Sequence, residues 1–259
     1  MIKGWEIDGL RVPLEEVGNE IFVADWPVSV LLQALEDSQE LSVRDWRVLR
    51  ASELGRCLRQ RFLKRQKEFW LSPDDVWLPL VGRGVHLELS RLAAGFFSPE
   101  EVLLEQRLSY PYRLSGDGVE GEEIVLTGQI DFYHRPSGTL VDYKTTSSVW
   151  HKDAASWEYL VQQNVYAQLL RWAGEQPKKS YLWFVEPKRG RSGVRRRLVE
   201  VGLWTEDEVV SLIEELGRII VLAGRDGVLP PPFREGDDGY WQCRFCPVQQ
   251  ACRALERGE

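Results

Sequence analysis

The chain lacks any apolar segment long enough to cross a membrane. Its best apolar stretch, around residues 219–224, is far shorter than the roughly 20 residues that a transmembrane helix needs. The opening residues, Met-Ile-Lys-Gly-Trp-Glu, contain no apolar core of a secretory signal. We therefore expect a cytoplasmic protein with no membrane partner.

Cysteine is scarce, with 4 in 259 residues, and the four are unevenly placed. Cys57 stands alone near the start, whereas Cys243, Cys246 and Cys252 close the chain as Cys-x2-Cys-x5-Cys. Cytosolic thiols stay reduced, so metal binding or catalysis is favoured over disulfides. Four thiolates are a ligand set of both structural zinc and iron–sulfur clusters, and the spacing alone does not separate the two.

Positive charge is also scarce: the chain has 33 Lys and Arg against 40 Asp and Glu, which gives a net charge of −7. This balance argues against a protein that coats nucleic acid, but a local basic patch can still contact it. Two basic runs stand out, one around Cys57 and one over residues 188–197, and each is either a solvated face or a DNA contact. The candidate DNA-binding residues are Arg56, Arg59, Arg61, Lys64, Arg189 and Arg191.

The overall amino-acid composition is typical of a folded enzyme, with 43% hydrophobic and 28% charged residues. The pattern predicts an α/β fold: helices, three strands, a helix, a strand pair, a helix and a cysteine-rich tail. Strands are expected at 102–112, 124–133, 139–145, 181–185 and 194–204. Helices are expected at 28–35, 52–66 (capped by Ser52, with Cys57 in its second turn), 79–96, 154–173 and 205–223. A hairpin-like piece is expected within residues 1–27.

The organisation that we predict has three parts. Residues 1–50 form an N-terminal extension, residues 51–228 the central core, and residues 229–259 a cysteine segment that closes a site with Cys57. No internal repeat or low-complexity linker interrupts this order.

Acidic residues gather on two adjacent strands of the predicted core. Asp131 ends the motif Gly128-Gln-Ile-Asp131, and Asp142-Tyr-Lys144 follows across the turn at residues 135–138. Strand periodicity puts Asp142 and Lys144 on one face and Tyr143 on the other. Clustered carboxylates favour Mg²⁺ or Mn²⁺, and a nearby lysine can orient water or offset phosphate charge. An exposed hairpin with scattered charges is the alternative.

These motifs resemble the PD-(D/E)xK phosphodiesterase superfamily, and within it the RecB-like nucleases. Those proteins share Gly-x-x-Asp, an Asp-Tyr-Lys-Thr strand and a downstream helix with Gln-x3-Tyr, which here reads Gln162 to Tyr166. The two share one helical face, whereas Gln163 falls on another. The resemblance implies a restriction-endonuclease-like core: a mixed central sheet flanked by helices, with a C-terminal iron–sulfur segment.

The resemblance also implies roles for individual residues. The catalytic set is Asp131, Asp142, Lys144, Gln162 and Tyr166. Manganese or magnesium would be held by His86, Asp131, Asp142 and the carbonyl of Tyr143. His86 belongs to Gly82-Arg-Gly-Val-His86, and neutral imidazole suits Mn²⁺ better than Mg²⁺. The other histidines, His134 and His151, are expected to be bystanders.

Cysteine layout narrows the resemblance further. Iron–sulfur RecB-like nucleases carry one cysteine before the core and Cys-x2-Cys-x5-Cys after it, which implies a structural [4Fe-4S] cluster on Cys57, Cys243, Cys246 and Cys252. Relatives fused to helicases are excluded because no Gly-x4-Gly-Lys-[Ser/Thr] loop is present.

A stand-alone chain of this size most resembles the CRISPR-associated adaptation exonucleases, the fourth Cas family. The implied task is trimming spacer precursors, DNA that is single-stranded or has single-stranded ends, alongside the integrase complex. A free-standing phage or repair nuclease and a non-catalytic DNA-binding scaffold are the alternatives.

Overall fold

The structure, a computed structural model, describes residues 2–7, 10–13, 45–71, 73–150, 152–190 and 193–258. The helix predicted at 28–35 lies outside these ranges. Of the N-terminal piece, β1 (Ile2–Ile7) and β2 (Leu10–Pro13) form the expected antiparallel hairpin. β1 also pairs in parallel with β4 (Phe69–Leu71), so a small second sheet stands beside the main one.

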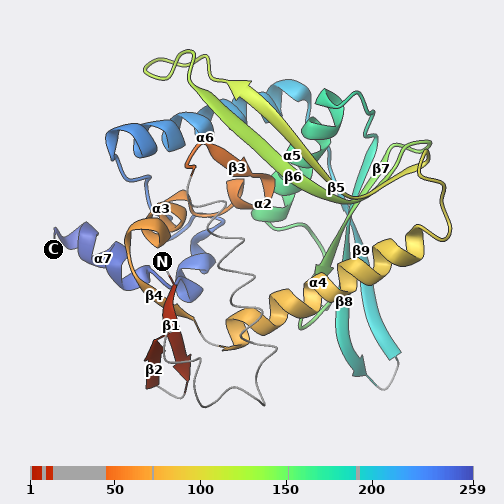
Figure 1. Cartoon of the computed structure of the whole chain (residues 1–259), viewed down its shortest axis with the longest axis horizontal. Coiled ribbons are helices and arrows are strands. Elements are labelled where there is room, and N and C mark those ends of the chain that lie inside the picture. Colours follow the sequence, from red (N-terminus) through yellow and green to blue (C-terminus); the bar gives the residue numbers. More distant parts are fainter. Residues whose placement is uncertain are drawn as a thin grey trace.

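The central sheet is mixed, as predicted, with the order β3-β6-β7-β8-β9 and with β5 paired to β6. Its strands are β3 (Val48–Arg50), β5 (Val102–Arg113), β6 (Glu123–His134), β7 (Thr139–Thr145), β8 (Lys179–Gly190) and β9 (Gly193–Val201). β7 and β8 run parallel, and α5 (Trp157–Trp172) makes the crossover between them. The long β5–β6 hairpin rises away from the rest of the sheet (Figure 1).

Helices lie on both sides of this sheet (Figure 1). α5 is buried along most of its length, with α6 (Glu206–Asp226) beside it, and the main apolar core lies between these helices and β5–β7. α4 (Pro73–Ala93) crosses the opposite side and contacts β7. Thr205 and Glu208 form the predicted capping box of α6, which satisfies N–H groups at its start.

Several boundaries differ from the prediction: α5 begins at Trp157 rather than at residue 154, and β8 spans Lys179–Gly190 rather than 181–185. The helix expected over 52–66 is broken into α2 (Ala51–Leu54) and α3 (Leu58–Gln66), and Cys57 is the N-cap of α3 rather than part of a second turn. The break follows from packing, because a Cβ at Gly55 would lie 2.5 Å from Glu158 Cα on α5. α4 begins at Pro73 and includes Pro79, which was expected to start it.

The cysteine-rich tail is helical, with η1 (Tyr240–Phe245) and α7 (Gln249–Arg257). α7 lies against α3 (Figure 1), so the C-terminal tail contacts the helix that follows Cys57. Leu63 and Phe69 pack against Val248 there. None of the helices in the described ranges has the length and apolar character of a membrane span.

Candidate active site

Asp131 and Asp142 meet where β6 and β7 separate. The two strands pair over residues 132–134 and 139–141, so both aspartates lie just beyond the paired segment. There Asp131 Oδ2 accepts a 2.8 Å hydrogen bond from the backbone N–H of Tyr143. The aspartates are 5% and 1% exposed, so two carboxyl groups are buried side by side at a fork in the sheet.

Lys144 and Asp142 join a polar network with α5. Lys144 Nζ lies 2.6 Å from Asp142 Oδ2 and donates to Gln162 Oε1 at 3.2 Å. Gln162 Nε2 donates to Asp142 Oδ1 at 3.1 Å and to the Tyr166 hydroxyl at 2.8 Å. Four of the five side chains predicted to be catalytic are therefore connected, and Gln162 is the link between strand and helix.

Gly128 explains how the helix comes so close to the strand. A Cβ at this position would lie 2.6 Å from Tyr166 Cε1 and 3.0 Å from Leu169 Cδ1. The bare backbone is needed because the Tyr166 ring, 6% exposed, lies directly on it. The glycine of one motif thus fixes the position of the tyrosine of the other.

His86 reaches the same place from α4. Its Nδ1 lies 3.3 Å from Asp131 Oδ1, and its ring stands edge-on to Tyr143 with centroids 5.7 Å apart. Glu105 joins them from β5, because ligand atoms of His86, Glu105 and Asp131 all lie within 4.8 Å of one another. Ser90 and Gln129 donate to the Glu105 carboxylate at 3.2 Å and 2.5 Å, which orients it.

Sequence reasoning missed Glu105, treating it as one more residue of a strand. Its φ of 48° is the one positive value at a non-glycine position among the described residues. Pairing with β6 continues at residues 104 and 106 but is interrupted at Glu105, opposite Asp131. A left-handed glutamate costs on the order of 1–2 kcal/mol, so surrounding contacts must hold it there. No local signal in the sequence marks this conformation.

Burial and mutual charge shift the pKa values of the site. Burial raises the pKa of Asp142 to about 6, with Lys144 opposing and Asp131 adding to the rise. Burial lowers the pKa of Lys144, but the Asp142 charge outweighs it and the net pKa is raised, so Lys144 is a cation. Burial also lowers the pKa of His86, but its hydrogen bond to Asp131 and the nearby carboxylates reverse the sign.

This chemistry suits a divalent cation. A group of carboxylates with one imidazole offers the oxygen and nitrogen ligands that Mn²⁺ accepts. Asp142 Oδ2 is buried and accepts no hydrogen bond of good geometry, despite its closeness to Lys144. The compact ligand group contains His86, Asp131 and Glu105, whereas Asp142 is held by Lys144 and Gln162.

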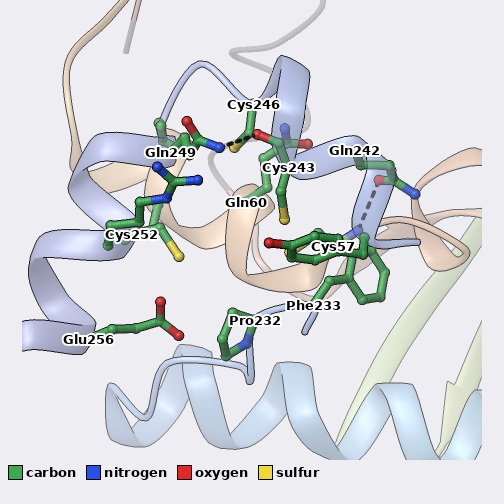
Figure 2. A pocket seen from close by; sticks show the side chains of 14 residues that line it. Cys57, Gln60, Pro232, Phe233, Gln242, Cys243, Cys246, Gln249, Cys252 and Glu256 are labelled. Carbon is green, nitrogen blue, oxygen red and sulfur yellow. Dashed lines mark hydrogen bonds between the residues drawn. The ribbon is translucent and has the colours of Figure 1, made fainter. Parts of the chain in front are cut away.

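The four cysteines gather at a second place, formed by chain segments that precede and follow these motifs. Cys57, Cys243, Cys246 and Cys252 line one cavity of about 90 Å³, and all four are free thiols (Figure 2). Gln242 Oε1 accepts from the Cys57 N–H at 3.4 Å, and Gln249 donates to the Cys243 carbonyl at 2.8 Å (Figure 2). Burial and the neighbouring cysteines raise the pKa values of Cys243 and Cys252.

The basic run around Cys57 divides into exposed and structural residues. Arg56 is exposed, and Arg59 and Lys64 are partly exposed. Arg61 is a correction to the DNA-binding prediction: its side chain is 10% exposed, donates to the carbonyls of Trp46 and Val48, and pairs with Glu53. Burial lowers its pKa to about 10, and these contacts make it a structural residue.

Other candidates lie away from the polar network. Gln163 is buried and accepts a 2.8 Å hydrogen bond from Ser180, so it holds α5 on β8. His134 contacts Ser137 in the β6–β7 turn. His151 and Arg191 lie outside the described residues, and the side chain of Arg189 is likewise not described.

The chain is similar to several solved structures. The crystal structure of SSO0001 superposes with a TM-score of 0.58 at 18% identity, over 90% of this chain and 96% of that one. A candidate exonuclease from Eubacterium rectale gives 0.33 at 16% identity, over 54% and 51%. A phage-related exonuclease from Haemophilus somnus 129PT gives 0.30 at 10% identity, over 54% and 67%.

The SSO0001 structure supports the fold alone, because its sequence identity is low. The other two TM-scores are too low to support a conclusion about this chain. A search of curated proteins returned no match. The model of the PD-(D/E)XK nuclease superfamily matches residues 29–253, which include every motif described above. The chain therefore belongs to the PD-(D/E)XK nuclease superfamily.

Proposed function

We propose that the chain is a divalent-metal-dependent deoxyribonuclease that trims DNA from an end. The observation that carries this proposal is the convergence of His86 from α4, Asp131 and Lys144 from the sheet and Gln162 from α5 at one buried fork. Four elements thus bring hydrogen-bond donors, acceptors and a cation into contact. Such an arrangement is expected at a phosphodiester-hydrolysing centre.

Each side chain has a role that its contacts support. A bound divalent ion polarises the phosphate and makes water more acidic. His86, Asp131 and Glu105 would hold it, with Asp142 and the Tyr143 carbonyl completing the site. Lys144, kept cationic by Asp142, offsets charge that develops on the phosphate.

Gln162 positions Lys144 through its amide oxygen and Asp142 through its amide nitrogen. Tyr166 fixes the rotamer of Gln162 by accepting from the same Nε2. Both are positioning residues in this proposal.

The test is digestion of end-labelled single-stranded DNA in the presence of Mn²⁺ or Mg²⁺. We expect Lys144→Ala to lose at least about a hundredfold in rate, the scale of a single electrostatic donor. Lys179→Ala is the matched control, because Lys179 is exposed at the opposite end of the β7–β8 pairing. Digestion by the Lys144→Ala variant at the wild-type rate would overturn the mechanism, and no digestion by the wild type would favour a DNA-binding scaffold.

We also propose a structural [4Fe-4S] cluster on the four cysteines. The convergence of Cys57 with the tail supports a shared ligand group. Four thiolates are a ligand set of both zinc and iron–sulfur clusters, so the choice of a cluster rests on the resemblance in cysteine layout.

The test of the cluster is anaerobic purification. Brown protein with iron and inorganic sulfide, both lost in Cys57→Ser, is the expected outcome. Colourless protein with one zinc would refute the cluster and leave the nuclease proposal intact.

A role in CRISPR adaptation is proposed from motif order and cysteine layout alone. In that role the protein would trim spacer precursors beside the integrase, and the alternative is a free-standing phage or repair nuclease. Incubation with a purified CRISPR integrase and a precursor with single-stranded overhangs tests it. Trimming to integrable length is expected, and no effect on integration would favour the alternative.

A further inference from the structure

An exposed tryptophan follows the catalytic strand directly. Trp150 comes six residues after Lys144, and 61% of it is exposed. The segment leading to it is ordered: Thr146 N–H donates to the Val185 carbonyl at 3.0 Å, and Val149 is buried in the cluster that includes Phe184. The ring therefore projects from an anchored turn rather than from a loose loop.

Arg195 of β9 holds the ring. Its guanidinium carbon lies 5.1 Å from the centroid of the Trp150 ring, and its Nη1 lies 3.8 Å from Glu186 on β8. Glu186, itself 7% exposed, also accepts from the Val149 N–H at 3.4 Å. One buried carboxylate thus ties the arginine and the turn together. A single guanidinium covers only one face of an indole, and cation–π contact of this kind fixes ring orientation.

Further cations lie close to Trp150 and Arg195 along the chain. Arg197 shares the strand face of Arg195 and pairs with Asp153, Lys152 lies 5.5 Å from the Phe184 ring centroid, and Arg196 is exposed on the other face of β9. The cations here outnumber the carboxylates although the whole chain has a net charge of −7. An exposed aromatic side chain among cations matches the two parts of single-stranded nucleic acid, its bases and its phosphates.

We propose that Trp150 and Arg195 form a stacking platform for an unpaired base of the DNA strand whose phosphate occupies the metal site. The inference rests on the proposed function and adds the two residues that would contact an unpaired base of the substrate. A paired base would not serve, because both of its faces are already stacked inside a duplex. The turn that carries Trp150 begins where β7 ends. Six residues span at most about 20 Å, so the platform lies within a few nucleotides of Lys144.

The test is binding of a fluorescein-labelled oligothymidylate, followed by anisotropy in chains that carry Lys144→Ala so that the probe is not cut. Trp150→Ala is expected to weaken binding about tenfold, the scale of one lost base stack. Trp150→Phe, which keeps an aromatic face, should stay within about threefold of its parent. Phe96→Ala is the matched control: Phe96 is 84% exposed and follows α4 near the opposite end of β7, and its loss should change nothing.

An abasic oligonucleotide separates stacking from charge. The parent chain should bind it about tenfold more weakly than oligothymidylate, and Trp150→Ala should cause no further loss. Equal loss on both probes, or equal loss on a blunt duplex, would overturn the platform, and so would Trp150→Ala binding within about twofold of its parent.

The two proposals fail separately. Wild-type protein that never cuts DNA but binds oligothymidylate through Trp150 would refute the nuclease and keep the platform. Cleavage with a Michaelis constant unchanged by Trp150→Ala would refute the platform and keep the nuclease.

Discussion

Replacing Gly128 with alanine tests whether the two sequence motifs are joined by direct packing. The new Cβ would lie 2.6 Å and 2.8 Å from two ring atoms of Tyr166, and the ring has little room to retreat because it is 6% exposed. Overpacking of this kind costs roughly 1–3 kcal/mol, and we expect about 2 kcal/mol of lost stability. Movement of the ring would also break the 2.8 Å bond from Gln162, so DNA cleavage should fall at least about tenfold.

Urea unfolding followed by circular dichroism gives the stability change. Gly84→Ala is the matched control, because Gly84 lies within α4 with no atom within 4 Å of its added Cβ, and this change should be neutral or stabilise by about 0.5–1 kcal/mol. In a Tyr166→Ala background the cost of Gly128→Ala should largely disappear. A cost that persists there, or a Gly128→Ala chain within about 0.5 kcal/mol of wild type, would refute the packing argument.

Three further outcomes are expected. Glu105→Gly relieves the positive φ but loses the hydrogen bonds from Ser90 and Gln129, so stability without metal should stay within about 1 kcal/mol of wild type. Mn²⁺ binding should weaken in calorimetry, and tighter binding would remove Glu105 from the ligand set. Mn²⁺ affinity should fall as pH drops through the raised pKa of His86, since a protonated ring cannot coordinate, and His86→Gln should flatten that profile. Gln163→Ala should leave the Ser180 hydroxyl unpaired and lower stability by about 1–3 kcal/mol in urea unfolding, with the rate per folded molecule unchanged.

Local patterns were enough for most elements of the fold. Strands β5, β6 and β7 are confirmed close to the predicted limits, because their β-branched and aromatic runs end at glycine or proline turns. The capping box of α6 is likewise local, since it involves residues only three apart. The break between α2 and α3 could not be seen, because it depends on the close approach of α5 to Gly55.

The sequence by itself determined the superfamily motifs, the pairing of Asp142 with Lys144 on one strand face, and the choice of Gln162 over Gln163. These depend on spacing along one strand or one helix, which the periods of 2.0 and 3.6 residues set directly. Only the tertiary structure placed Glu105 in the site, made Arg61 structural, and brought Arg195 over Trp150. Each of these depends on side chains from separate elements meeting in space, and no local pattern records such a meeting.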